Sequence, residues 1–282
     1  MTSVGVVGCG LMGSGIAESV ARAGYTTIVR EVDEARLTAG RERLRRSLET
    51  AVSRGKIPAI DGEAAHARLQ FTTSLADLAD CDVVIEAATE NLDVKLPLFR
   101  ELDQRCKPAT ILASNTSSIP IIRLAAATRR RDRVLGLHFF NPVPVMPLVE
   151  VIRTIATSNE TVAKALSLGA ALGKKAIQAQ DRAGFIVNTL LIPYLLDAAR
   201  MLENGHATRE DIDEGMRLGC GHPMGPLRLL DFVGIDTACF IAEIMYAELN
   251  DPRYAAPPLL RQMNIAGLHG RKAGRGFYEY GA

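Results

Sequence analysis

Short apolar, often β-branched runs recur through the first two-thirds of the chain, and between them apolar residues return every three or four positions. The runs predict strands over residues 3–8, 26–31, 82–87, 110–113, 134–139, 148–152 and 175–179. Between the second and third runs, Leu37, Leu44 and Leu48 mark one face of an amphipathic helix over residues 33–53. Strands that alternate with helices predict an α/β fold, a Rossmann-type, doubly wound and mostly parallel sheet.

The strand pattern stops near residue 181, and helical patterns continue to the end of the chain. We expect helices over residues 184–204, 225–249 and 257–267, and another that begins after Thr208 with Asp211 in the capping-box position. The sequence therefore predicts an α/β domain over residues 1–183 and a smaller, all-helical domain over residues 184–282.

A glycine-rich turn joins the first strand to the first predicted helix. Its glycines allow a tight turn, close approach of the backbone to a pyrophosphate, and close contact between helix and strand, while the helix N-terminus offers N–H donors. The motif predicts a dinucleotide site, whose residues are Gly8, Gly10, Leu11, Met12 and Gly13. FAD uses the same turn, so the motif alone leaves NAD and FAD as alternatives.

An acidic residue ends the second strand. Glu31 follows Gly13 by 18 residues (31 − 13), where a carboxylate accepts hydrogen bonds from the adenosine ribose. Because a carboxylate repels a 2′-phosphate, Glu31 favours NAD over NADP. Arg30 is the one neighbour that could favour NADP instead.

A histidine and a glutamate lie in two apolar strands on either side of a proline-rich turn. His138 is in the run 134–139 and Glu150 in the run 148–152. A buried carboxylate is costly unless it is paired. If the strands are neighbours, Glu150 orients one imidazole nitrogen while the other exchanges a proton with substrate, which predicts a general acid–base pair. A core histidine without a catalytic role is the alternative.

Motifs along almost the whole chain resemble the L-3-hydroxyacyl-CoA dehydrogenases, and most closely their short bacterial type, the 3-hydroxybutyryl-CoA dehydrogenases. In order, these motifs are GCGLMGSGIA from residue 8, Glu90 with Lys95, SNTSS from residue 114, HFFNP from residue 138, Glu150, GFIVN from residue 184, HPMGP from residue 222 and KAGRGFY from residue 272.

The resemblance implies NAD-dependent, reversible oxidation of an L-3-hydroxyacyl-CoA. It implies that His138 is the base, that Glu150 is its partner, and that Ser117 and Asn188 bind the reacting oxygen. From the residues alone, Ser117 could equally be a helix cap and Asn188 a structural hydrogen-bonding residue.

The resemblance also assigns residues to the two ligands. On the cofactor side it adds Glu90, Lys95 and Asn115, and on the substrate side it adds Asn141, Ser47, Arg54 and Lys56, the last three as CoA contacts. The alternatives are a solvated ion pair for Glu90 with Lys95 and an ordinary solvated helix face for the basic residues.

Composition restricts the partners. The chain has 33 Lys and Arg against 32 Asp and Glu, a net charge of +1, which argues against nucleic-acid binding. Five scattered cysteines without a CxxC pair indicate a reduced, cytoplasmic protein without a bound metal, and no apolar stretch is long enough to cross a membrane. The apolar content of residues 184–202 and 227–246 predicts a homodimer.

Two competing functions remain: a dehydrogenase acting on acyl carrier protein, and a non-catalytic cofactor-binding protein.

Overall fold

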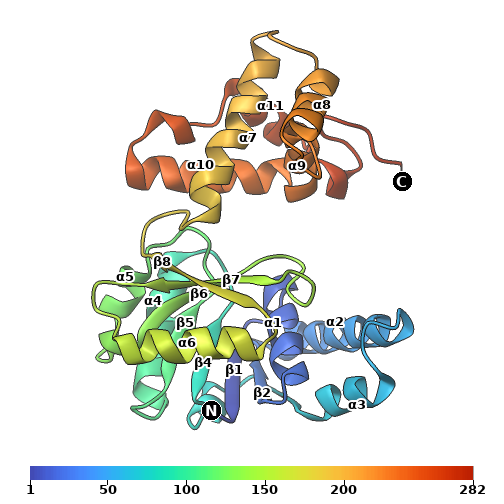
Figure 1. Ribbon diagram of the computed structural model, residues 1–282. Coiled ribbons are helices and arrows are strands. Elements are labelled where there is room, and N and C mark those ends of the chain that lie inside the picture. Colours follow the sequence, from blue (N-terminus) through green and yellow to red (C-terminus); the bar gives the residue numbers. More distant parts are fainter. Residues whose placement is uncertain (282) are drawn as a thin grey trace. The chain divides into compact units, whose positions relative to one another are not determined.

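The computed structural model describes residues 1–281, and its contacts divide the chain into two units, Met1–Arg182 and Ala183–Ala282. The first unit is an α/β sheet domain and the second is helical (Figure 1). The predicted fold class is confirmed. The division falls after Arg182, one residue before the expected boundary.

One sheet of eight strands forms the first unit, in the order β3-β2-β1-β4-β5-β6-β7-β8. Neighbouring strands are parallel except β6 and β7, which are antiparallel. The strands are β1 (Ser3–Val7), β2 (Thr26–Arg30), β3 (Leu69–Thr72), β4 (Val83–Glu86), β5 (Ile111–Ser114), β6 (Val134–Phe139), β7 (Leu148–Arg153) and β8 (Lys175–Gln180).

Both faces of the central strands are covered, which explains their continuous apolar runs. Successive residues of a strand point to opposite faces, and Val6 with Val7 in β1 and Val84 with Ile85 in β4 are all buried. The helices of this unit are α1 (Leu11–Arg22), α2 (Glu34–Ser53), α3 (Ala59–Ala67), α4 (Leu92–Arg105), α5 (Ile121–Ala126) and α6 (Asn159–Ala171), with short 3₁₀ turns η1 (Leu75–Leu78) and η2 (Arg131–Arg133).

Strand β3 was not predicted from the sequence. This four-residue strand lies at the edge of the sheet and contains no fully buried residue, so it lacks the apolar run that marks the central strands.

The second unit has its own apolar core. Its elements are α7 (Val187–Glu203), α8 (Arg209–Gly219), α9 (Pro226–Val233), α10 (Ile235–Leu249) and α11 (Pro258–Ile265), with 3₁₀ turns η3 (Pro252–Tyr254) and η4 (Arg271–Ala273). Among the described residues, no helix is both long and apolar enough to cross a membrane.

Two helix predictions in this unit were wrong in detail. The helix expected from residue 184 begins only at Val187, because Gly184 and Phe185 have φ angles of +83° and +48°, which no α-helix contains. The single helix expected over residues 225–249 is divided into α9 and α10 by Gly234, whose φ is +99°. The predicted cap of α8 is present, since Thr208 Oγ1 accepts a hydrogen bond from Asp211 N at 3.1 Å.

Candidate active site

The glycine turn after β1 has the shape that a pyrophosphate requires. Gly8 has a φ of +94°, and a Cβ atom on Gly13 would lie 1.9 Å from the Gly8 carbonyl oxygen. Both positions therefore require glycine. A Cβ atom on Gly10 would meet nothing within 4 Å, so the backbone at Gly10 is accessible to a ligand. These three glycines therefore fit the phosphate-binding turn of a dinucleotide site.

Glu31 faces this turn. Its two carboxylate oxygens accept hydrogen bonds from Cys9 N at 2.6 Å and Val32 N at 3.0 Å. Arg30 has another partner, because its Nε donates to the Thr73 carbonyl at 3.2 Å. The Glu31 carboxylate thus lies beside the glycine turn, and its contact with the adenosine ribose stays a prediction.

Cys9, between the first two glycines, is a packing residue. A Cβ atom on Gly40 of α2 would lie 2.5 Å from Cys9 Sγ, so α2 approaches the turn closely. Burial, with a smaller effect of Glu31, raises the pKa of the Cys9 thiol to about 12 despite the opposing charge of Arg43. The thiol is therefore neutral and unreactive at ordinary pH.

His138 and Glu150 lie directly opposite each other on the antiparallel strands β6 and β7. His138 Nδ1 and Glu150 Oε2 are 2.6 Å apart, and the two residues are 6% and 0% exposed. The Phe140 ring packs 4.6 Å from the imidazole, centroid to centroid. The strand register explains the pairing, since opposite residues in an antiparallel pair project to the same face.

Two side chains bind the backbone of the segment that follows His138. Asn115, after β5, accepts a hydrogen bond from Phe139 N through its Oδ1 at 2.9 Å. Asn141 is exposed at the start of the following turn and precedes a cis proline. Lys174 was not predicted as a site residue. Its Nζ donates hydrogen bonds to the carbonyls of Val143 and Met146 at 2.6 and 2.8 Å. Burial lowers the pKa of Lys174, whose ammonium holds this turn.

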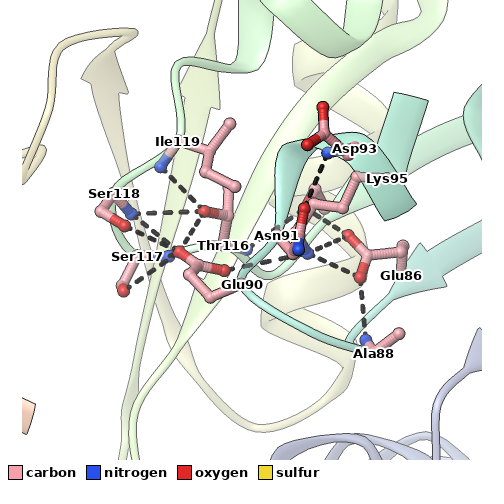
Figure 2. Close-up of polar contacts among 11 residues, drawn as sticks. Glu86, Ala88, Glu90, Asn91, Asp93, Lys95, Thr116, Ser117, Ser118 and Ile119 are labelled. Atoms are coloured by element: carbon pink, nitrogen blue, oxygen red, sulfur yellow. Dashed lines mark hydrogen bonds and ion pairs between the residues drawn. The ribbon is translucent and has the colours of Figure 1, made fainter. Parts of the chain in front are cut away.

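Ser117 lies in a loop after β5 that is held by Glu90 (Figure 2). Glu90 Oε1 accepts hydrogen bonds from Thr116 Oγ1 at 2.5 Å, Ser117 N at 3.0 Å and Ser118 Oγ at 2.8 Å. Ser117 Oγ is more distant, at 3.4 Å. The loop is thereby fixed through its neighbours, while the Ser117 hydroxyl makes the longest of these contacts.

Lys95, predicted near the cofactor, is buried against Glu86. Its Nζ lies 2.5 and 2.6 Å from the two oxygens of Glu86. Glu86 ends β4 and was not predicted, because its only sequence signal is a carboxylate at the end of an apolar run. The solvated ion pair considered for Glu90 with Lys95 is wrong in one respect, since Lys95 is only 2% exposed.

The remaining predicted contacts are more scattered. Ser47 in α2 donates to the buried carboxylate of Glu18 at 2.5 Å, so its hydroxyl has a structural partner. Arg54 caps the C-terminus of α2, and both Arg54 and Lys56 are exposed. Asn188 is a buried residue in the first turn of α7, in the second unit.

Comparisons with known proteins agree along the whole chain. The family described as 3-hydroxyacyl-CoA dehydrogenase, NAD binding domain, matches residues 3–182, and 3-hydroxyacyl-CoA dehydrogenase, C-terminal domain, matches residues 184–280. The 3-hydroxybutyryl-CoA dehydrogenase of Mycobacterium tuberculosis is 54% identical over 279 residues, which cover 98% of either chain.

Solved structures are similar to the same extent. The crystal structure of M. tuberculosis FadB2 has a TM-score of 0.96 at 54% identity and covers 99% of this chain and 98% of its own. That of (S)-3-hydroxybutyryl-CoA dehydrogenase PaaH1 from Ralstonia eutropha has a TM-score of 0.95 at 44% identity, with full coverage of both chains.

Proposed function

The chain belongs to the 3-hydroxyacyl-CoA dehydrogenase family, and from this we propose that it oxidises a short-chain substrate, 3-hydroxybutyryl-CoA, with His138 and Glu150 as its acid–base pair. The predicted reaction class, an NAD-dependent oxidation of a 3-hydroxyacyl-CoA, and the predicted cofactor are confirmed by the family and its relatives. The observation that carries the proposed mechanism is the buried contact of 2.6 Å between His138 Nδ1 and Glu150 Oε2.

In the proposed oxidation, His138 accepts the proton of the substrate hydroxyl through Nε2. NAD, which the glycine turn and Glu31 would hold, would supply the hydride acceptor for C3. The products of the proposed oxidation are then the 3-oxoacyl thioester, NADH and a protonated imidazole. Glu150 stabilises that imidazolium through Nδ1 and keeps the ring in one orientation. In the reverse direction the imidazolium returns its proton to the carbonyl oxygen.

The other site assignments are part of the same proposal. Ser117 and Asn188 bind the reacting oxygen, and Asn141 shapes the substrate side. The proposed cofactor contacts are Gly8, Gly10, Leu11, Met12, Gly13, Glu31, Glu90, Lys95 and Asn115. The proposed CoA contacts are Ser47, Arg54 and Lys56, of which Ser47 would have to exchange its bond to Glu18.

We further propose a cytoplasmic homodimer in which the helical unit, residues 184–282, supplies the dimer contacts and part of the substrate site. Large apolar side chains are exposed on this unit, among them Leu190, Phe232, Phe240 and Tyr246. Such side chains support the proposal where they combine into one apolar patch, because a patch of that kind is typical of an interface.

The direct test is an assay of NADH oxidation with acetoacetyl-CoA as the acceptor, in which the decrease in NADH absorbance is recorded. The proposal expects turnover that depends on the thioester, and loss of that turnover in His138→Ala. Binding of NADH without any turnover would support the non-catalytic alternative. Turnover with acetoacetyl-acyl carrier protein but not with acetoacetyl-CoA would show that the substrate is carried by acyl carrier protein.

A further inference from the structure

The carboxyl ends of β4 and β5 enclose a buried ion pair (Figure 2). Glu86 is fully buried and binds the Lys95 ammonium with both oxygens, at 2.5 and 2.6 Å. The same carboxylate accepts hydrogen bonds from Ser114 Oγ at 2.7 Å and Ala88 N at 2.8 Å. A buried carboxylate persists only when it is paired and hydrogen-bonded, and Glu86 meets both conditions.

A second carboxylate lies beside this pair. Glu90 Oε2 is 3.8 Å from Lys95 Nζ, beyond hydrogen-bonding distance, while Glu90 Oε1 holds the loop that carries Ser117. Lys95 therefore has two carboxylates within reach and hydrogen-bonds to only one of them.

Without the charge of Glu86, Glu90 would become the nearest carboxylate to the buried ammonium. A charge-assisted N–H···O bond is typically about 2.8 Å long, so Lys95 and Glu90 would need to approach by only about 1 Å. Glu90 would then divide its charge between the ammonium and the loop, and the contacts to Thr116, Ser117 and Ser118 would weaken.

We propose that Glu86 is a positioning residue: by binding Lys95, it keeps Glu90 on the loop that carries Ser117. The inference rests on the proposed function, in which Ser117 binds the reacting oxygen. Glu86 does not touch the substrate in this account and acts only through Lys95 and Glu90.

The test is a pair of variants in the acetoacetyl-CoA assay. Glu86→Gln keeps the shape and removes the charge, and it should lower kcat about 10- to 100-fold, the order of loss that a misplacement of about 1 Å produces. Adding Lys95→Met removes the competing ammonium. Because Lys95 is itself a proposed cofactor contact, the double variant is compared with Glu86→Gln by amide hydrogen exchange at Ser117 and Ser118 and not by kcat.

A matched control lies on the same helix as Lys95. Glu101 and Arg105 form an exposed ion pair at 2.8 Å in α4, and Glu101→Gln should leave kcat unchanged. Thermal unfolding of every variant separates stability from positioning. A purely structural Glu86 would lower Tm and leave kcat of the folded enzyme unchanged, which would overturn the proposal. A double variant in which Ser117 and Ser118 exchange as fast as in Glu86→Gln would overturn it as well.

Two further measurements keep the proposal testable. If Glu86→Gln does not fold, Glu86→Asp keeps the charge but withdraws it from Lys95 by one methylene, and any loss of kcat in that variant should be accompanied by faster amide exchange at Ser117 and Ser118. A loss of kcat with exchange at the wild-type rate would overturn the proposal. Amide hydrogen exchange at Ser117 and Ser118, which donate to Glu90, should be faster in Glu86→Gln and return to the wild-type rate in the double variant. If the wild type lacked turnover, the proposed function would fail, and exchange alone would still decide the role of Glu86.

Discussion

Replacing Glu150 with glutamine tests the acid–base pair most directly. The amide oxygen of the introduced side chain can still accept a hydrogen bond from His138 Nδ1, so Glu150→Gln preserves the ring orientation and removes only the negative charge. The charge matters when the imidazole is protonated, and in the oxidation this occurs as the substrate proton is transferred. The effect should therefore fall on kcat more than on the KM of the substrate.

The magnitude follows from the burial of the pair. Glu150 is fully buried and His138 nearly so, so water screens their interaction weakly. A hydrogen bond to a charged group contributes about 1.5 to 3 kcal/mol. Since about 1.4 kcal/mol changes a rate tenfold, Glu150→Gln should lower kcat about 10- to 100-fold.

The assay is acetoacetyl-CoA-dependent NADH oxidation over a range of pH, with His138→Ala and the double variant in parallel. His138→Ala should lose at least about 100-fold in kcat, and the double variant should be no slower, because Glu150 acts through His138. Glu160→Gln is the control, since Glu160 forms an exposed pair with Lys164 in α6. Full kcat with an unchanged pH profile in Glu150→Gln would refute the pairing.

Four other outcomes are expected. NADH should give a higher kcat/KM than NADPH, because Glu31 faces the glycine turn, and the reverse order would show that Arg30 dominates. A disulfide reagent should react with one thiol of the native protein, the exposed Cys220, and with all five thiols after unfolding. Burial raises the pKa of the Cys9 thiol to about 12, so this thiol should stay unreactive between about pH 7 and 9. Light scattering should give the mass of a dimer, and a fully active monomer would exclude the proposed interface. The double variant Arg54→Ala, Lys56→Ala should raise the KM of acetoacetyl-CoA and leave unchanged the KM of a truncated thioester that lacks the nucleotide. Equal effects on the KM of both substrates would show that these residues do not belong to the CoA site.

The features that were predictable without a structure are local. The glycine turn with Glu31 was predictable because strand, turn and helix follow one another within about 30 residues, and only glycine tolerates the conformation at Gly8 and the contact at Gly13. The central strands were predictable because burial on both faces demands a continuous apolar run. Edge strand β3 and the break at Gly234 were missed, because a half-buried strand and a single glycine leave weak local signals.

Which polar groups meet depends on the tertiary arrangement. His138 and Glu150 are 12 residues apart in the chain, and the antiparallel register of β6 and β7 places them opposite each other, whereas a shift of one residue would send them to different faces. Glu86 had only one sequence signal, a carboxylate at the end of an apolar run, and its partners in α4 and β5 meet it only where neighbouring strands end. Ser47 was assigned to CoA by resemblance, and nothing in its local sequence indicated its partner Glu18, 29 residues away on α1. Local conformational preference depends on residues that are adjacent in the chain, whereas the pairing of buried charges depends on which strands and helices become neighbours.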